Sequence, residues 1–102
     1  IPEPPPPGPN AINVNEPCKV LESNETCNIE GSGIVTVQGR INLKQIKAVE
    51  VLVNDEIADL DRGDGSFEII LFDIEDGKND ITISAMDSEG KIKELSFQIS
   101  AN

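Results

Sequence analysis

Residues 66–87 read SFEIILFDIEDGKNDITISAMD, and this stretch decides the fold. Its first part, Ser66–Ile74, is apolar on both faces in its middle, which is typical of a central strand or of a strand with a bulge. Its last part, Ile81–Met86, alternates apolar and polar residues and predicts a strand with one buried face. Asp76-Gly77 supplies turn residues between the two. The stretch therefore predicts two β-strands joined by a short turn.

The same period of two continues along most of the chain from Cys18 onward. Further strands are expected at Lys19–Glu22, Ile34–Gly39, Ile46–Val53, Ile57–Leu60 and Ile92–Ser100. Clusters of Gly, Asn and Asp separate these runs, and no window of a dozen residues has helical spacing. The sequence therefore predicts an all-β fold, an antiparallel β-sandwich. Its core is expected to contain Val, Ile and Leu together with Phe67, Phe72 and Phe97.

The composition limits the kinds of partner. The 102 residues include 19 Asp and Glu but only 8 Lys and Arg, which gives a formal net charge of −11, and there is no histidine. Such a charge repels nucleic acid and anionic membranes, and no apolar run approaches the ~20 residues that span a bilayer. Catalysis finds no support, because neither cysteine has a neighbouring base and the acidic pairs lie in open turns. We expect no nucleic-acid partner, no membrane insertion and no enzyme activity.

Residues 1–16 are expected to be a Pro-rich linker or leader, followed by a single domain at residues 17–102. Residues 1–10, IPEPPPPGPN, favour polyproline II because proline lacks an N–H donor and fixes φ. The next residues alternate apolar and polar side chains, so Ile12 and Val14 are candidates for adding a strand to a neighbour's exposed sheet edge. A chain that opens on isoleucine is expected to be a processed product or a piece of something longer.

The two cysteines, Cys18 and Cys27, point to a disulfide formed in an oxidising compartment, although two free thiols in a cytosolic protein would give the same sequence. Two thiolates without histidine are too few good ligands for zinc. Between them, Asn24-Glu25-Thr26 is a sequon, which makes Asn24 a candidate glycosylation site. We therefore expect an extracellular or cell-surface protein.

Four segments resemble, in order, the motifs of bacterial immunoglobulin-like domains, including the glucodextranase B-type. Residues 35–39, VTVQG, resemble "V-x-V-x-G", and residues 49–55, VEVLVND, resemble "V-x-V-x-V-N-G". Residues 65–67 match "G-S-F", and residues 76–87 match "x-G-x-N-x-I-x-V-x-A-x-D", closed by Gly90. The resemblance covers about residues 34–100 and departs at Asp55, where glycine is usual, and at Lys91, where asparagine is common. It implies an immunoglobulin-like β-sandwich of about seven strands, whose motif residues are structural, in secreted or surface-anchored prokaryotic proteins.

The stretch Asp61-Arg62-Gly63-Asp64-Gly65 is expected to be a hairpin loop, because it lies between two strands and is rich in residues that tolerate positive φ. Arg62, Gly63 and Asp64 also form an adhesion tripeptide, which we keep as a lesser hypothesis. The loop fails the EF-hand pattern, since Gly63 and Asp64 stand where a ligand and the obligatory glycine belong.

Strand alternation predicts where the charged connections meet. The connections around Glu30, Asp55-Glu56 and Asp73–Asp76 should gather at one end, which would be almost purely acidic. The opposite end, around residues 40–44, 61–64 and 87–89, should mix both signs. Converging carboxylates suit Ca²⁺, so Asp55, Glu56, Asp73 and Asp76 are candidate calcium ligands; a solvated acidic rim is the alternative. No other cofactor is expected.

These patterns favour a non-catalytic structural or spacer module of a larger secreted or cell-surface protein, with neighbouring domains as its partners. A second hypothesis is a self-assembling subunit of an extracellular filament, whose identical subunits are joined through the N-terminal segment. A third is an adhesin or glycan-binding module, which depends on Arg62–Asp64. Sugar binding usually needs aromatic platforms, and the three phenylalanines at strand positions are expected in the core instead.

Overall fold

The computed structural model describes residues 11–20 and 24–102, and residues 1–10 and 21–23 lie outside the described part. All regular structure in the described part is β-strand, and no helix there is long and apolar enough to cross a membrane. The strands are β1 (Ile12–Glu16), β2 (Thr26–Ile29), β3 (Gly33–Ile41), β4 (Ala48–Val53), β5 (Glu56–Ile57), β6 (Asp59–Leu60), β7 (Ser66–Ile74), β8 (Gly77–Asp87) and β9 (Ile92–Ala101).

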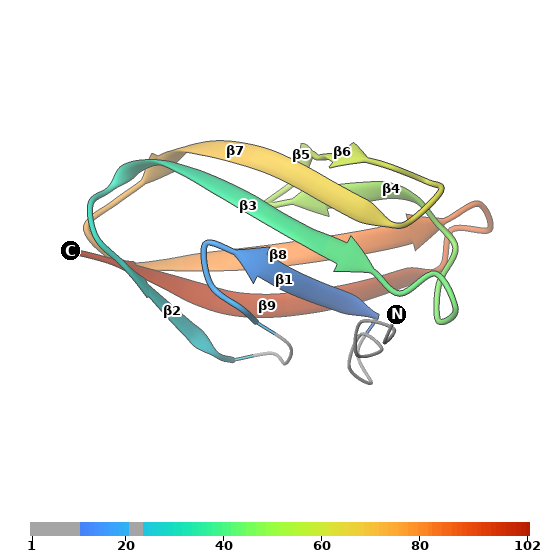
Figure 1. Ribbon diagram of the computed structural model, residues 1–102, viewed down its shortest axis with the longest axis horizontal. Helices are drawn as coiled ribbons and strands as arrows, with labels where there is room; N and C mark the ends of the chain where they lie inside the picture. Colours follow the sequence, from blue (N-terminus) through green and yellow to red (C-terminus); the bar gives the residue numbers. More distant parts are fainter. Residues whose placement is uncertain (1–10, 21–23) are drawn as a thin grey trace, which may run out of the picture.

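The strands form two sheets that face each other as a sandwich (Figure 1). One sheet has four strands in the order β1-β3-β7-β6, and the other has five in the order β2-β9-β8-β4-β5. This arrangement confirms the predicted all-β sandwich. The described residues contain nine strands rather than about seven, because β1 and β2 are added at the sheet edges and the expected strand at 57–60 is split between the two sheets. Of the strand expected at 19–22, Val20 makes only an isolated bridge with Val14, and residues 21 and 22 lie outside the described part. One pairing also differs: β2 runs parallel to β9, whereas the other paired strands are antiparallel.

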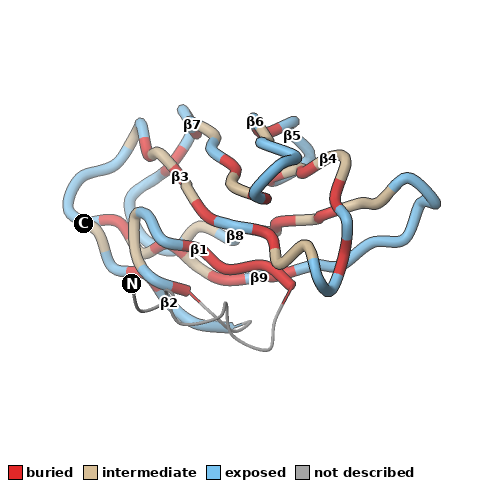
Figure 2. The backbone as a smooth tube through the Cα atoms, turned by 45° about the vertical axis from the view of Figure 1, so that its right-hand side comes forward, coloured by how far each residue is buried: buried red, intermediate tan, exposed pale blue. Residues whose placement is uncertain are grey.

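The core lies between the two sheets, and buried positions alternate along most of β3, β8 and β9 (Figure 2). Val, Ile and Leu from both sheets supply most of it, together with Phe67 and Phe97, as the period of two predicts. Phe72 is the exception, because 71% of it is exposed. The expectation that all three phenylalanines enter the core was therefore wrong for Phe72.

The structure differs from the expected domain boundary at residues 16 and 17. Strand β1 lies within the range assigned to the leader, and it pairs antiparallel with β3 at the edge of the four-stranded sheet. Ile12 and Val14 are buried in the domain's own core, and Val14 exchanges two backbone hydrogen bonds with Val20, of 2.9 and 3.0 Å. The apolar side chains of this alternating segment therefore pack inside their own domain. Because both are β-branched and buried, they contribute hydrophobic free energy to the sandwich itself.

The first and last strands bring the described chain to opposite ends of the sandwich. At one end Asn42, just after β3, donates its N–H to the carbonyl of Ala11 (2.7 Å). At the other end Gly31, just before β3, donates to the carbonyl of Asn102 (2.8 Å). The nine residues of β3 separate these two points, which corresponds to roughly 30 Å at the usual rise per residue.

Candidate functional site

The outer face of the four-stranded sheet, which points away from the five-stranded sheet, is divided into an apolar and a polar half. Along the β3–β7 ladder, Thr36 pairs with Ile70, Gln38 with Glu68, and Arg40 with Ser66. Outward side chains therefore change from apolar near the start of β3 to polar and charged near its end. The two halves offer different chemistry to a partner.

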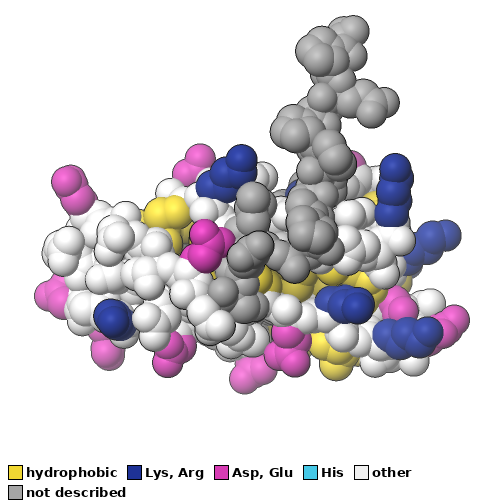
Figure 3. Space-filling view, turned by 90° about the horizontal axis from the view of Figure 1, so that it is seen from below, with side chains coloured by type: hydrophobic (Ala, Val, Ile, Leu, Met, Phe, Trp, Pro, Cys, Tyr) yellow, Lys and Arg dark blue, Asp and Glu magenta, His cyan; other side chains and the backbone are white. Residues whose placement is uncertain are grey.

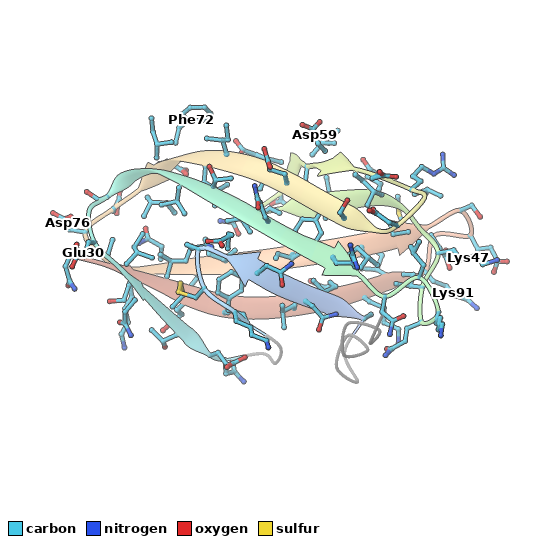
Figure 4. The ribbon with its side chains drawn as sticks, viewed as in Figure 1. Glu30, Lys47, Asp59, Phe72, Asp76 and Lys91 are labelled. Carbon is cyan, nitrogen blue, oxygen red and sulfur yellow. A yellow bond between two sulfur atoms is a disulfide. The ribbon has the colours of Figure 1, made fainter. Side chains whose placement is uncertain are left out.

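The apolar half consists of Ile34, Ile70 and Phe72, which we call the apolar patch. Ile34 lies on β3 between the residues that pair with Leu71 and Ile74, so it stands across from Phe72 on β7. The exposed fractions are 68% for Ile34, 44% for Ile70 and 71% for Phe72. Figure 4 shows the Phe72 side chain pointing outward from the surface of the sheet. A large exposed aromatic side chain beside two exposed isoleucines is typical of an interaction surface.

A bulge lies beside this patch. The register shifts between Gly33 and Val35, so that one residue of β3, Ile34, lies opposite two residues of β7, Phe72 and Asp73. The extra residue lets Ile74 return to the core while Phe72 and Asp73 both stay exposed. The sequence did contain a signal for the patch: with Phe67 and Leu71 on the buried face, a period of two puts Ile70 and Phe72 on the outer face.

The polar half contains an open hollow of about 590 Å³. Its charged and amide side chains are those of Asn15, Gln38, Arg40, Asp59, Asp61 and Glu68. Gln38 Nε2 donates to Glu68 Oε2 (2.6 Å), which ties the two central strands together. The aromatic ring at this hollow belongs to Phe67, which is buried. A sugar would find hydrogen-bonding groups here but no exposed ring on which to stack.

The adhesion tripeptide forms the tight loop that joins β6 to β7. Asp61 Oδ1 accepts a hydrogen bond from the N–H of Gly63 (2.8 Å), and Gly65 donates its N–H to the Asp61 carbonyl (2.8 Å). Arg62 is exposed. The Asp64 carboxylate is used by the loop itself, since its Oδ1 accepts bonds from the Ser66 N–H (2.8 Å) and hydroxyl (2.7 Å).

These contacts perturb the acidity of Asp64. The hydrogen bond from the Ser66 hydroxyl, then that from the Ser66 N–H, lower the pKa of the Asp64 carboxyl from its ordinary value of 3.8. Arg40 lies 3.9 Å away and acts in the same direction. The geometry is that of a self-contained turn, and adhesion through Arg62, Gly63 and Asp64 stays a prediction.

The candidate calcium ligands are not gathered into one group. Glu30 and Asp76 lie at the same end of the sandwich (Figure 4), and Asp73 precedes that end on β7. Strand β4 ends early, however, and the Asn54 N–H bonds to the Thr82 carbonyl (2.9 Å), which leaves Asp55 and Glu56 beside the middle of β8. In residues 11–20 and 24–102, no group of three or more Asp, Glu, His or Cys side chains is placed to hold a metal ion.

The disulfide between Cys18 and Cys27 is present, with its Cα atoms 5.7 Å apart. It joins the segment after β1, in the four-stranded sheet, to β2, at the edge of the five-stranded sheet. Asn24 is exposed in the connection between the two cysteines, with φ at 71°, and its N–H bonds to the Ser96 carbonyl (2.8 Å). Its side chain is thus on the surface, and glycosylation there stays a prediction.

A second hollow, of about 370 Å³, lies at the end opposite the apolar patch. It is lined by Leu43, Lys47, Ala48, Val49, Arg62 and Ser88. We call it the cationic hollow, because the charged side chains among its lining residues are those of Lys47 and Arg62. Figure 4 shows Lys47 and Lys91 at this end, and Figure 3 shows most of the lysine and arginine side chains of one face toward it. Of the predicted acidic end, Glu30 and residues 73–76 lie together in the structure, whereas Asp55 and Glu56 do not reach that end.

Neither a protein-family model nor a curated protein sequence matches the chain. Among solved structures, the chain is similar to one of the fibronectin(III)-like modules of CbhA from Clostridium thermocellum. The TM-score is 0.55, and the alignment covers 89% of this chain and 95% of that chain at 17% sequence identity. A likeness at this identity shows the fold alone. The domain therefore has an immunoglobulin-like fold of the fibronectin type III kind.

Proposed function

We propose that this domain is a non-catalytic structural module that separates neighbouring domains in a larger secreted or surface-anchored prokaryotic protein. The observation that carries the proposal is the position of its two connections. The described chain enters beside Asn42 and leaves beside Gly31, at opposite ends of β3. A domain with its connections at opposite ends adds its own length to the distance between its neighbours.

The cellular setting of the proposal has its own support. A disulfide between Cys18 and Cys27 suits an oxidising compartment. The segments that resemble bacterial immunoglobulin-like domains, including Gly65-Ser66-Phe67, suit a prokaryotic module whose motif residues are structural. Rigid sandwiches of this kind can carry many functions, so the spacer role depends on the geometry of the connections rather than on the fold class.

The proposal is tested by small-angle X-ray scattering from chains that contain one, two and three tandem copies of the domain. We expect the maximum dimension to grow by about 30 Å with each added copy, the length of a nine-residue strand. A matched chain in which flexible Gly-Ser linkers replace the direct connections should grow less regularly. A maximum dimension that stays nearly constant would contradict the spacer role, because the connections would then fold back on one side.

The adhesin or glycan-binding hypothesis predicts that the single domain binds a glycan array or an integrin. If Asp64→Asn or Gln38→Ala abolishes such binding, the adhesin hypothesis is favoured over the spacer. Gln38 lines the polar hollow and Asp64 closes the loop, so the two substitutions separate the two surfaces. Under the spacer proposal we expect no binding in either assay.

A further inference from the structure

We propose that the domain associates head to tail with a second copy of itself, with the apolar patch of one copy seated on the cationic hollow of the next. This inference goes beyond the spacer role and does not depend on it, because a monomeric domain would still separate its neighbours. It differs from assembly through Ile12 and Val14, which are buried inside the domain. The contact would use only exposed surfaces of a folded domain.

The apolar patch is a concentrated surface. Of the five large apolar side chains exposed in the described residues, three share the outer face of β3 and β7 and make up the patch. The other two, Ile57 and Ile92, lie on separate strands of the five-stranded sheet. From the exposed fractions, the patch presents roughly 300 Å² of apolar surface, which is within the size range of patches that bind partners.

The surroundings of the apolar patch are acidic. The sequence has no Lys or Arg between residues 20 and 39 or between residues 63 and 77, the two stretches that contain β3 up to Gly39 and all of β7. Glu30 and Asp76 lie at the same end of the sandwich (Figure 4) and Asp73 is the next-to-last residue of β7, and all three are exposed. A partner surface that covers the patch must therefore bring cations to its rim, because like charges brought together across an interface are costly.

The cationic hollow meets this requirement on the same molecule. Leu43, Ala48 and Val49 are its apolar lining residues, and Lys47 and Arg62 are exposed beside them. Six of the eight Lys and Arg residues lie in or next to the connections at this end, namely Arg40, Lys44, Lys47, Arg62, Lys91 and Lys93. The same connections carry Asp61, Asp64, Asp87 and Glu89, and Arg40 and Lys91 lie 3.9 Å from Asp64 and Glu89. This end thus has mixed sign as a whole, but the charged residues that line the hollow itself are the cations Lys47 and Arg62.

Charge favours this unequal contact over a symmetric dimer. A two-fold contact between two apolar patches would oppose Glu30, Asp73 and Asp76 of both copies. The apolar area is small in either arrangement, well below the ~800 Å² per partner of stable interfaces. A contact between two different surfaces is heterologous, so it continues from copy to copy unless its rotation closes a ring.

The expected affinity is low, and its salt dependence has a definite sign. An area this small suggests a dissociation constant on the order of 10⁻⁴ M. Each copy carries a net charge of −11, and at 0.01 M salt the Debye length of about 30 Å lets the whole molecules repel each other. At 0.15 M that length falls to about 8 Å, which screens the net repulsion but not charges in contact. We expect stronger association at 0.15 M than at 0.01 M salt.

The experiment is sedimentation equilibrium of the whole chain up to millimolar concentration, with three single variants. Phe72→Ser removes the largest side chain of the apolar patch, and Lys47→Glu cancels the net positive charge that Lys47 and Arg62 give the cationic hollow. Both substituted residues are exposed, so folding is retained. Ile57→Ser is the matched control, since Ile57 is 72% exposed but lies outside both surfaces. We expect the association constant to fall about tenfold or more in the first two variants and to stay unchanged in the control.

A mixture of the two interface variants gives the decisive result. Phe72→Ser keeps an intact hollow and Lys47→Glu keeps an intact patch, so the mixture should form a one-to-one dimer and nothing larger. In the same way, Asp73→Lys combined with Lys47→Glu should restore association of the double variant by exchanging the two charges.

A wild-type chain that remains monomeric at millimolar concentration would overturn the inference. A dimer that Phe72→Ser abolishes but that Lys47→Glu leaves intact would also overturn it, in favour of a symmetric contact.

Discussion

Gly39 shows how the packing of one ring decides which residue a strand accepts. It occupies an inward position of β3, and the ring of Phe67 lies where a side chain would be, with Cζ 2.7 Å from an ideal Cβ at Gly39. The carbonyl oxygen of Asn13 on β1 is also too close to that Cβ. The glycine of the "V-x-V-x-G" segment is therefore required by contacts from both neighbouring strands.

We predict that Gly39→Ala destabilises the domain by about 2–3 kcal/mol, because the added methyl group overpacks the site and neither neighbour is free to move. Urea unfolding measures the change. The double variant Gly39→Ala with Phe67→Leu should lose less than the sum of the two single losses, since removing the ring relieves one of the two clashes. Strict additivity would mean that the Phe67 ring does not restrict Gly39.

Asp64 gives a prediction for pH dependence at the residue scale. Because its pKa is lowered in the folded state, its contribution to stability is complete above the ordinary pKa of 3.8 and is lost as the pH falls through the lower folded value. Asp64→Ala should therefore lower the melting temperature slightly at pH 7, and the difference from the wild type should shrink in strong acid. Asp64→Asn keeps an acceptor for Ser66 and should lose less. A difference that grows in acid would contradict this assignment.

At the scale of elements, Asn79 holds the turn between β7 and β8. Its Nδ2 donates to the carbonyl oxygens of Glu75 (2.8 Å), Gly77 (3.2 Å) and Ile99 (3.2 Å), and its Oδ1 accepts the Glu75 N–H (2.9 Å). We predict that Asn79→Ala costs about 2 kcal/mol in unfolding free energy, since several backbone groups lose their partner at once. The exposed Ser88→Ala in the opposite turn serves as control. Equal effects would mean that the Asn79 bonds do not stabilise the turn.

Strand β2 is held by its pairing with β9 and by the disulfide at Cys27. It has four residues at a sheet edge and is paired with β9 alone. We predict that Cys18→Ser with Cys27→Ser destabilises the domain by about 2.5 kcal/mol, the chain-entropy value for a loop of this length. Hydrogen exchange should quicken in β2 before it does in β8. Unchanged exchange in β2 would show that its hydrogen bonds with β9 suffice.

For the whole molecule, the separation of the acidic residues predicts the response to calcium. Asp55 and Glu56 lie beside the middle of β8, away from the end that carries Asp76, so we expect 5 mM CaCl₂ or EDTA to leave the melting temperature unchanged within about 1 °C. MgCl₂ at the same ionic strength is the control. A rise specific to calcium would restore Asp55, Glu56, Asp73 and Asp76 as candidate ligands.

Much of the whole fold follows from the sequence, whereas the bulge beside the apolar patch does not. The alternation in residues 66–87 is enough to predict β7, β8 and their turn, because local period and turn residues act over a few positions. The bulge at Phe72 and Asp73 depends on how β7 pairs with β3, about forty residues away. The pairing of β2 cannot be predicted locally either. The chain crosses from the four-stranded sheet to the five-stranded sheet between β1 and β2, and β2 then pairs parallel with β9.

The sequence by itself determined the fold class and the order of most strands, and it predicted the disulfide without excluding two free thiols. The strands follow from residue type and spacing, which short-range geometry converts directly into strands and turns. Only the tertiary structure decided that the two cysteines are joined, that Ile12 and Val14 enter the core, that β7 bulges beside Phe72, and that the candidate calcium ligands stay apart. These outcomes depend on register and strand length, which are fixed when two sheets close around a shared core and not by any single segment.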